Sequence, residues 1–150
     1  MIGASVAYDL VFLGHILAAL ATVVVLVTMR FSALAVLRGV GPDEQRRRFP
    51  ERRNWAVRVV HLLPVTGFVL SLSGDSSVSL SRPWIGVGLL CYLAAAGHLE
   101  ARTLPLERVV ADTVSHHEVA SPDRGRQLMR SVDVLLGLMA VALVAMLVQF

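Results

Sequence analysis

The sequence predicts an all-α protein, a transmembrane bundle of four helices with short interfacial helices on the cytoplasmic side. Of its 150 residues, 55% are apolar and only 17% are charged, whereas a soluble domain carries roughly 25% charged residues. The charged residues gather in blocks, and the uncharged stretches between the blocks are long enough to cross a lipid bilayer. We expect residues 1–150 to form a single transmembrane domain.

The first predicted span covers residues 8–37 and is the strongest. Within it, residues 10–29 contain no Asp, Glu, Lys or Arg, and at about 1.5 Å per residue this stretch covers roughly the thickness of the hydrocarbon core. The second predicted span, residues 55–73, reaches the required length only if Arg58 extends its guanidinium to the membrane surface. Pro64 lies inside this span, and neighbouring helices are expected to satisfy the carbonyl that it frees.

The third predicted span covers residues 83–104. Pro83 suits a first helical turn, and the helix is expected to end at Leu104 because Pro105 disfavours a helical conformation in the residue before it. Apolar residues recur at helical spacing over 106–117, which predicts a second helix lying on the membrane surface.

Two further helix starts are marked by proline followed by acidic residues. Gly41-Pro42 predicts a short helix between the first two spans, and Ser121-Pro122 predicts the start of the helix that becomes the fourth span, residues 131–150.

The arginines predict the orientation of the four spans. The chain has fourteen arginines and no lysine. Thirteen of them lie in or beside the two longer connections, at positions 30, 38, 46, 47, 48, 52, 53, 58, 102, 108, 124, 126 and 130. Only Arg82 lies in the connection between the second and third spans. The positive-inside rule then places both long connections in the cytoplasm and both termini outside. The absence of lysine beside abundant Ala, Val and Leu is typical of a GC-rich bacterial genome, so the expected membrane is a bacterial inner membrane.

Three histidines lie at membrane depth, where ionisable groups are costly and become candidates for function. His15 is expected about 10 Å below the outer surface and is interpreted as a helix-packing residue. His61 and His98 lie on antiparallel helices at nearly equal depth, each six residues from the inner end of its span. Two imidazoles so placed could ligate one b-type haem from its two faces, which makes them the predicted cofactor ligands. The alternative is that each imidazole hydrogen-bonds to a neighbouring helix.

Acidic residues near the cytoplasmic ends of the spans predict a belt of ion pairs. Glu100 and Asp133 fall on the side where Arg30, Arg58, Arg102 and Arg130 also gather. Such pairs contribute little individually in the hydrated headgroup region. Cys91 lies inside an apolar stretch and is expected to be a small buried residue, so no metal site is predicted.

Several short sequences resemble a known family. Residues 13–19 (LGHILAA), 80–85 (LSRPWI) and 104–108 (LPLER) resemble a bacterial family of integral membrane proteins that is known only as a domain of unknown function. That family is distantly similar to the membrane domain of copper-resistance D proteins and to small haem-associated protoporphyrinogen oxidases. The resemblance implies a four-span fold and no established activity. The oxidases are associated with an intramembrane lysine, which this sequence lacks, and no copper-binding Met, Cys or His tract is present.

The sequence therefore favours a non-enzymatic accessory or scaffold subunit that acts through helix–helix contacts with membrane partners or with a second copy of itself. No nucleophile elbow, phosphate loop or zinc-binding helix motif is present, and small residues line two spans, at Gly14 and Ala18 and over 94–97. The basic residues lie between apolar stretches, a pattern that does not predict nucleic-acid binding. The alternative function is a membrane redox protein that binds haem b through His61 and His98.

Overall fold

The computed structural model describes residues 2–49, 56–73 and 82–148, and every regular element in these ranges is helical. The elements are α1 (Ile2–Leu37), α2 (Pro42–Arg48), the 3₁₀ helix η1 (Ala56–His61), α3 (Leu62–Ser73), α4 (Pro83–His98), the π-helix η3 (Leu99–Thr103), α5 (Leu104–Ser115) and α6 (Pro122–Val148). Residue 55 and residues 149–150, which begin and end predicted spans, lie outside the described ranges.

Three helices are long and apolar enough to cross a membrane: Val6–Leu37, Pro83–Ser115 and Pro122–Val148. A fourth apolar helix, Val57–Leu72, is shorter. The prediction of a helical protein with membrane-spanning segments is confirmed to this extent.

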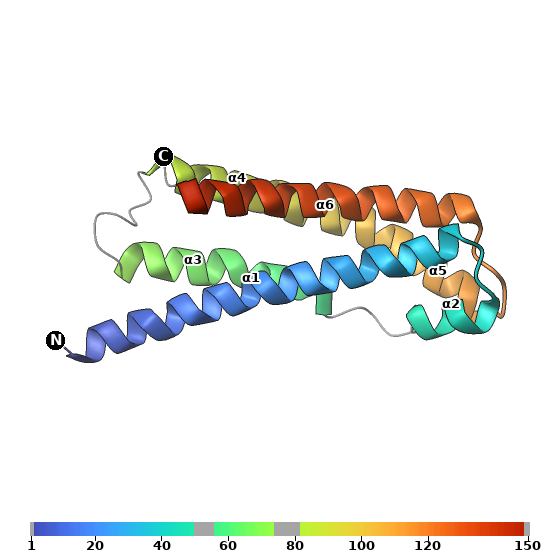
Figure 1. The fold of residues 1–150 in the computed structure, drawn as a ribbon, viewed down its shortest axis with the longest axis horizontal. Helices are drawn as coiled ribbons and strands as arrows, with labels where there is room; N and C mark the ends of the chain where they lie inside the picture. Colours follow the sequence, from blue (N-terminus) through green and yellow to red (C-terminus); the bar gives the residue numbers. More distant parts are fainter. Residues whose placement is uncertain (1, 50–55, 74–81, 149–150) are drawn as a thin grey trace.

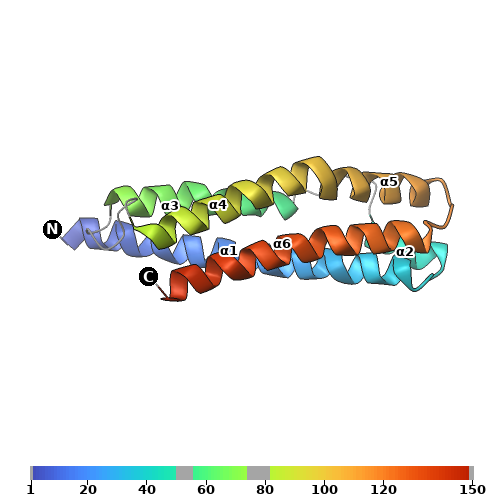
Figure 2. The ribbon, with the colours of Figure 1, turned by 90° about the horizontal axis from the view of Figure 1, so that it is seen from above.

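Helix α1, helix α3, the continuous helix from α4 to α5, and helix α6 lie side by side along the long axis of the molecule, and each runs opposite to the one before it (Figure 1). The start of α1, the end of α3, the start of α4 and the end of α6 share one end of the molecule, whereas α2, α5 and the start of α6 share the other (Figure 2). Helix α1 packs against α3 and α6, and α4 packs against α6, while α3 and α4 touch each other little.

Helix α1 ends in a Schellman motif that turns the chain into α2. Gly39 has φ +68°, its N–H donates to Val36 O at 3.0 Å, and Val40 N–H donates to Ala35 O at 3.3 Å. Glycine suits this left-handed position because it has no Cβ to clash with the neighbouring carbonyl. Helix α2 then begins at Pro42, as predicted.

The second apolar segment begins as a 3₁₀ helix and becomes α-helical at Leu62, two residues before Pro64. Pro64 therefore lies in the first turn of α3, directly after the change from 3₁₀ to α-helix, where the fixed φ of proline fits the helix.

The predicted helix end at Leu104 is wrong, because the chain stays helical from Pro83 through Pro105 to Ser115. The five residues Leu99–Thr103, directly before Leu104 and Pro105, form a π-helix. A proline in a regular α-helix clashes with the carbonyl four residues earlier, and a widened turn is one way to relieve that clash. Proline thus changes the type of helix here without ending it.

Two residues of the apolar stripe on α5, Val110 and Val114, are buried against the core, and α5 packs against α2 and α6, whereas Val109 is exposed. The position of this helix on the membrane surface stays a prediction. Helix α6 begins at Pro122, as predicted, with Ser121 O accepting hydrogen bonds from the N–H groups of Arg124 and Gly125.

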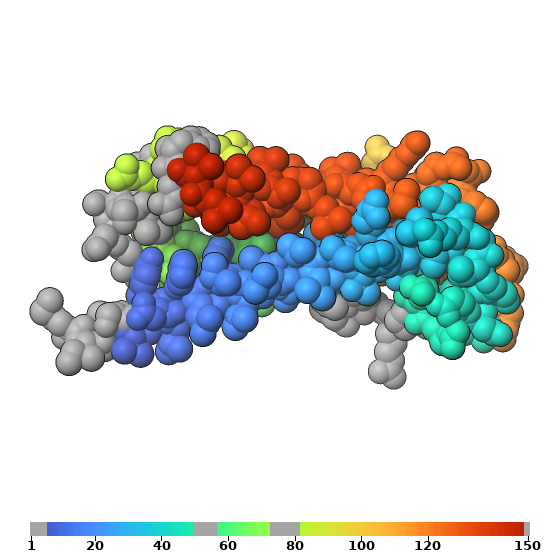
Figure 3. Space-filling model, in the orientation of Figure 1, coloured from blue at the N-terminus to red at the C-terminus, as the bar shows by residue number. Residues whose placement is uncertain are grey.

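The hydrophobic core lies mainly in the half of the molecule that carries α2 and α5. Its members include Val36, Phe49, Val114 and Leu128. Figure 3 shows α1 against α6 in this half and diverging from α6 toward the start of α1. In the other half, large apolar side chains such as Leu17 are exposed, a surface suited to lipid or to another apolar helix.

Candidate functional site

His15 joins α1 to α3. Its ring is 8% exposed, and Nδ1 lies 2.7 Å from Thr66 Oγ1. The Thr66 hydroxyl itself donates to Leu62 O at 2.7 Å, so its oxygen is left to accept the hydrogen bond from His15. The ring also rests on Gly67, where an added Cβ would lie 3.4 Å from His15 Cε1. The interpretation of His15 as a helix-packing residue is confirmed.

His61 joins η1 to the helix formed by α4 and η3. Its Nδ1 lies 3.0 Å from the Tyr92 hydroxyl, and its Nε2 lies 3.6 Å from Glu100 Oε1. The His61 and Tyr92 rings meet edge to face, with their centroids 6.2 Å apart. Arg58 approaches the same oxygen of Glu100 at 3.8 Å. A neutral imidazole fits this arrangement if Nε2–H points to the carboxylate and Tyr92 donates to Nδ1.

His98 joins α4 to α6. Its Nε2 lies 2.9 Å from Ser131 Oγ, and the same hydroxyl lies 2.8 Å from Thr103 Oγ1. Ser131 and Thr103 are buried. One serine of α6 therefore meets polar side chains from both α4 and η3.

The two predicted haem ligands are engaged with different neighbours. His61 bonds toward Tyr92 and Glu100, whereas His98 bonds to Ser131. His98 and Glu100 are two residues apart, which places their side chains roughly 200° apart around a helix. Each imidazole thus has its own interhelical contact. The contact of His61 with Glu100 and the contact of His98 with Ser131 lie on different sides of the helix formed by α4 and η3. Haem ligation by His61 and His98 stays a prediction.

An ion pair joins α1 to α6. Arg30 Nε of α1 donates to Asp133 Oδ1 of α6 at 2.6 Å. Together with the contacts of His15, His61 and His98, this pair completes a ring of polar links from α1 to α3, from η1 to α4, from α4 to α6 and from α6 back to α1. We call these four contacts the interhelical clasps.

The predicted belt of ion pairs is confirmed for Glu100 with Arg58 and for Asp133 with Arg30. Arg102 and Arg130 were expected to join the same belt. Within the described part of the chain, neither of these two guanidinium groups has a hydrogen-bond or ion-pair partner.

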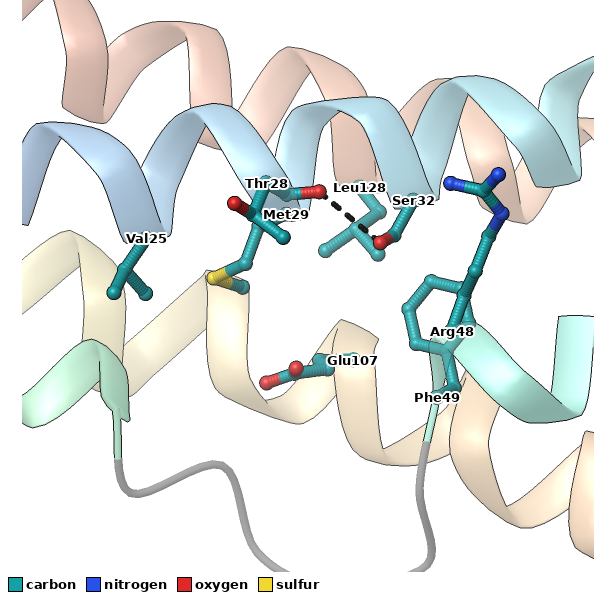
Figure 4. Close-up of a pocket in the computed structure, with 8 residues that line it drawn as sticks. All are labelled: Val25, Thr28, Met29, Ser32, Arg48, Phe49, Glu107 and Leu128. Atoms are coloured by element: carbon teal, nitrogen blue, oxygen red, sulfur yellow. Dashed lines mark hydrogen bonds between the residues drawn. The ribbon is translucent and has the colours of Figure 1, made fainter.

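A cavity of about 160 Å³ lies between α1, the end of α2, α5 and α6 (Figure 4). Its polar lining comprises Thr28, Ser32, Arg48 and Glu107. The Ser32 hydroxyl is already used, since it donates to Thr28 O at 3.0 Å, and Arg48 is hydrogen-bonded to Glu44. No sequence pattern indicated this cavity, because its residues come from elements far apart in the chain.

The described residues include no group of three or more His, Cys, Asp or Glu side chains that could hold a metal ion. Cys91 is buried and free, as expected for a small apolar residue.

Comparisons of the chain with protein-family models, with curated proteins and with solved structures gave no match. The resemblance of the 13–19, 80–85 and 104–108 segments to a bacterial membrane protein family therefore stays a prediction.

Proposed function

We propose that the protein is a four-span protein of the bacterial inner membrane with both termini outside. The three long apolar helices and the shorter Val57–Leu72 helix supply the four spans. The start of α1 and the end of α6 lie at the same end of the molecule (Figure 1), and the arginine-rich α2 lies at the other end, which the positive-inside rule assigns to the cytoplasm.

Within that membrane, we propose that the chain acts as an accessory or scaffold subunit through helix–helix contacts. The interhelical clasps carry this proposal. They use the three deep histidines and the Arg30–Asp133 pair to fix the helices against one another, and a polar contact between helices in an apolar medium favours one arrangement of helices over others. A fixed bundle can present a constant surface to a partner.

The surface offered to a partner is the exposed apolar face of α1. Five large apolar side chains on this face recur every three or four residues, and each is at least 53% exposed. They are Leu10, Leu13, Leu17, Leu20 and Val24. This spacing places them along one side of the helix. Leucine stripes of this kind pack against a second apolar helix as readily as against lipid tails.

Native mass spectrometry after gentle detergent extraction tests the proposal. We expect the chain to be retained with a second membrane protein or with a second copy of itself. The double substitution Leu13→Ala and Leu17→Ala should release that partner, whereas Val144→Ala and Leu147→Ala, on an exposed part of α6, should not. A monomer under all extraction conditions would contradict the proposal.

The alternative is a haem-binding redox protein. It is tested by the visible spectrum of protein purified with haem supplied, because a bis-imidazole haem b gives a strong Soret band. The alternative predicts that His61→Ala and His98→Ala both abolish this band and that His15→Ala does not. A spectrum without a Soret band, or one unchanged in His61→Ala, would contradict it.

A further inference from the structure

A groove of about 510 Å³ runs between α6 and the helix formed by α4, η3 and α5. Arg102, Arg130 and Gln127 supply charged and amide donors to its lining, and Pro105, Leu106 and Val134 supply apolar surface. Among the described residues, its lining holds no Asp or Glu, and its other polar members are His98 and Ser131. The described lining thus combines two positive charges with apolar surface and no carboxylate.

The two guanidinium groups are available to a ligand. Among the described residues, the two carboxylates nearest in sequence are engaged elsewhere, Asp133 with Arg30 and Glu100 with His61 and Arg58. Arg102 and Arg130 have no such partner and are exposed. Guanidinium groups form short, charge-assisted hydrogen bonds with phosphate oxygens, often two at a time.

Beyond the groove, toward the middle of the apolar segments, each of the two helices carries a glycine on the same face, and we call the strip along these two glycines the furrow. Along α4, Gly97 precedes Ala101 by one helical turn, and along α6, Gly137 follows Val134 by about one turn. An added Cβ on Gly97 or on Gly137 would meet nothing within 4 Å. Small residues at these positions leave space along the helices for an extended hydrocarbon chain.

We propose that this groove binds one acidic phospholipid of the cytoplasmic leaflet. Arg102 and Arg130 hold the phosphate, Gln127 donates to the polar headgroup, and an acyl chain lies in the furrow over Gly97 and Gly137. Anionic lipids attract basic residues at this leaflet, and a groove lined by two arginines adds a defined place to that attraction. The inference rests on the membrane orientation in the proposed function and is independent of any protein partner.

The test uses the full-length protein in phosphatidylcholine nanodiscs that contain increasing fractions of phosphatidylglycerol. Native mass spectrometry then counts the phosphatidylglycerol molecules retained by each protein. Wild-type protein should retain one such lipid, and the pair Arg102→Gln and Arg130→Gln should weaken its apparent affinity about tenfold or more. The matched control is Arg108→Gln with Arg124→Gln, which removes the same charge from α5 and α6 outside the groove.

A second variant tests the furrow with both arginines intact. Val134→Trp fills the groove and should also reduce retention of phosphatidylglycerol.

Equal losses in the arginine pair and its control would show attraction by the whole leaflet and overturn the proposal. Equal retention of phosphatidylcholine, or displacement of the lipid by millimolar inorganic phosphate, would overturn it as well. A monomer that keeps its one lipid would overturn the scaffold proposal alone, whereas a partner-bound protein without lipid would overturn this one alone.

Discussion

Gly125 of α6 lies directly against the backbone of Leu37 at the end of α1. A methyl group at Gly125 would lie 2.5 Å from the Leu37 nitrogen and 2.9 Å from the carbonyl oxygen of Ala33. Backbone atoms cannot rotate away as a side chain can, so the absence of a Cβ at this position sets how closely the two helices approach. The contact lies in the same half of the molecule as the core.

We therefore expect Gly125→Ala to destabilise the protein. Separating the two backbones should cost about 1–3 kcal/mol in the free energy of unfolding, as overpacking does elsewhere, and should outweigh the gain in helix propensity. Thermal unfolding in detergent measures the effect. Gly137→Ala is the matched control on the same helix, because an added methyl group there meets nothing within 4 Å, and it should be neutral or stabilising. A Gly125→Ala protein as stable as the control would contradict the prediction.

Gln45 ties together the two connections at the α2 end of the molecule. Its side chain is 0% exposed, Nε2 donates to Val40 O at 3.0 Å, and Oε1 accepts from Ala120 N–H at 2.9 Å. Gln45→Leu would leave both backbone groups without their partner. We expect a loss of about 1–3 kcal/mol for each buried group left unpaired, and faster hydrogen exchange at the Ala120 amide.

Gln45→Glu provides a graded comparison, because it keeps an acceptor for Ala120 and loses the donor to Val40. It should be less disruptive than Gln45→Leu at the Ala120 amide. The control is Gln127→Leu, an exposed glutamine, which should leave exchange at Ala120 unchanged.

Ser131 is the shared partner of His98 and Thr103. Ser131→Ala would leave the His98 imidazole and the Thr103 hydroxyl without this contact, and we expect a loss of roughly 1 kcal/mol, typical of interhelical hydrogen bonds in membranes. A double-mutant cycle with Thr103→Val isolates the coupling between the two hydroxyls. Ser115→Ala on α5 is the control, because this half-buried hydroxyl donates within its own helix, to Asp112 O, and not to another helix. Additive effects of Ser131→Ala and Thr103→Val would contradict a direct contact.

The Glu44 carboxylate in α2 should titrate at an unusually low pH. Hydrogen bonds from Arg48 and then from Arg47 lower the pKa of Glu44 below its ordinary value. A carboxylate whose pKa is lower in the folded state than in the unfolded state stabilises the fold at neutral pH, and this contribution is lost as the pH falls through the folded-state pKa. Carbon-13 NMR of the side-chain carboxyl measures the titration. Arg48→Gln should raise the pKa of Glu44 toward the ordinary value, and an unchanged titration would contradict the assignment.

Much of the fold could be predicted from local sequence signals. Proline with acidic residues in the first turn marked the starts of α2 and α6, because both features are local to a helix end. The ion pairs of Glu100 and Asp133 also followed from charges gathered near the same end of the spans. Each of these features depends on the position of a residue along its helix axis, and that position can be calculated by counting residues.

The direction in which a side chain points around its helix could not be predicted in the same way. His61 and His98 were matched in depth, but which neighbour each one faces depends on how the helices are rotated and packed. The same reason hides the partners of Gln45 and the close approach at Gly125, since both depend on segments far away in the sequence. Pro105 was misjudged because its usual local effect was countered by a change of helix type.

The π-turn at Leu99–Thr103 also changes the direction in which the side chains of α5 point around the helix axis. A turn closed by i→i+5 bonds holds one more residue than an α-turn, so it shifts the later side chains by about 100° around the axis. Val110 and Val114 reach the core in this shifted register. Deleting one residue within Leu99–Thr103 could therefore be absorbed by closing this turn as an α-turn, which leaves the two valines on the core. The same deletion in a regular turn of α4 would swing them off the core, so the number of residues is constrained everywhere along this helix except at the π-turn.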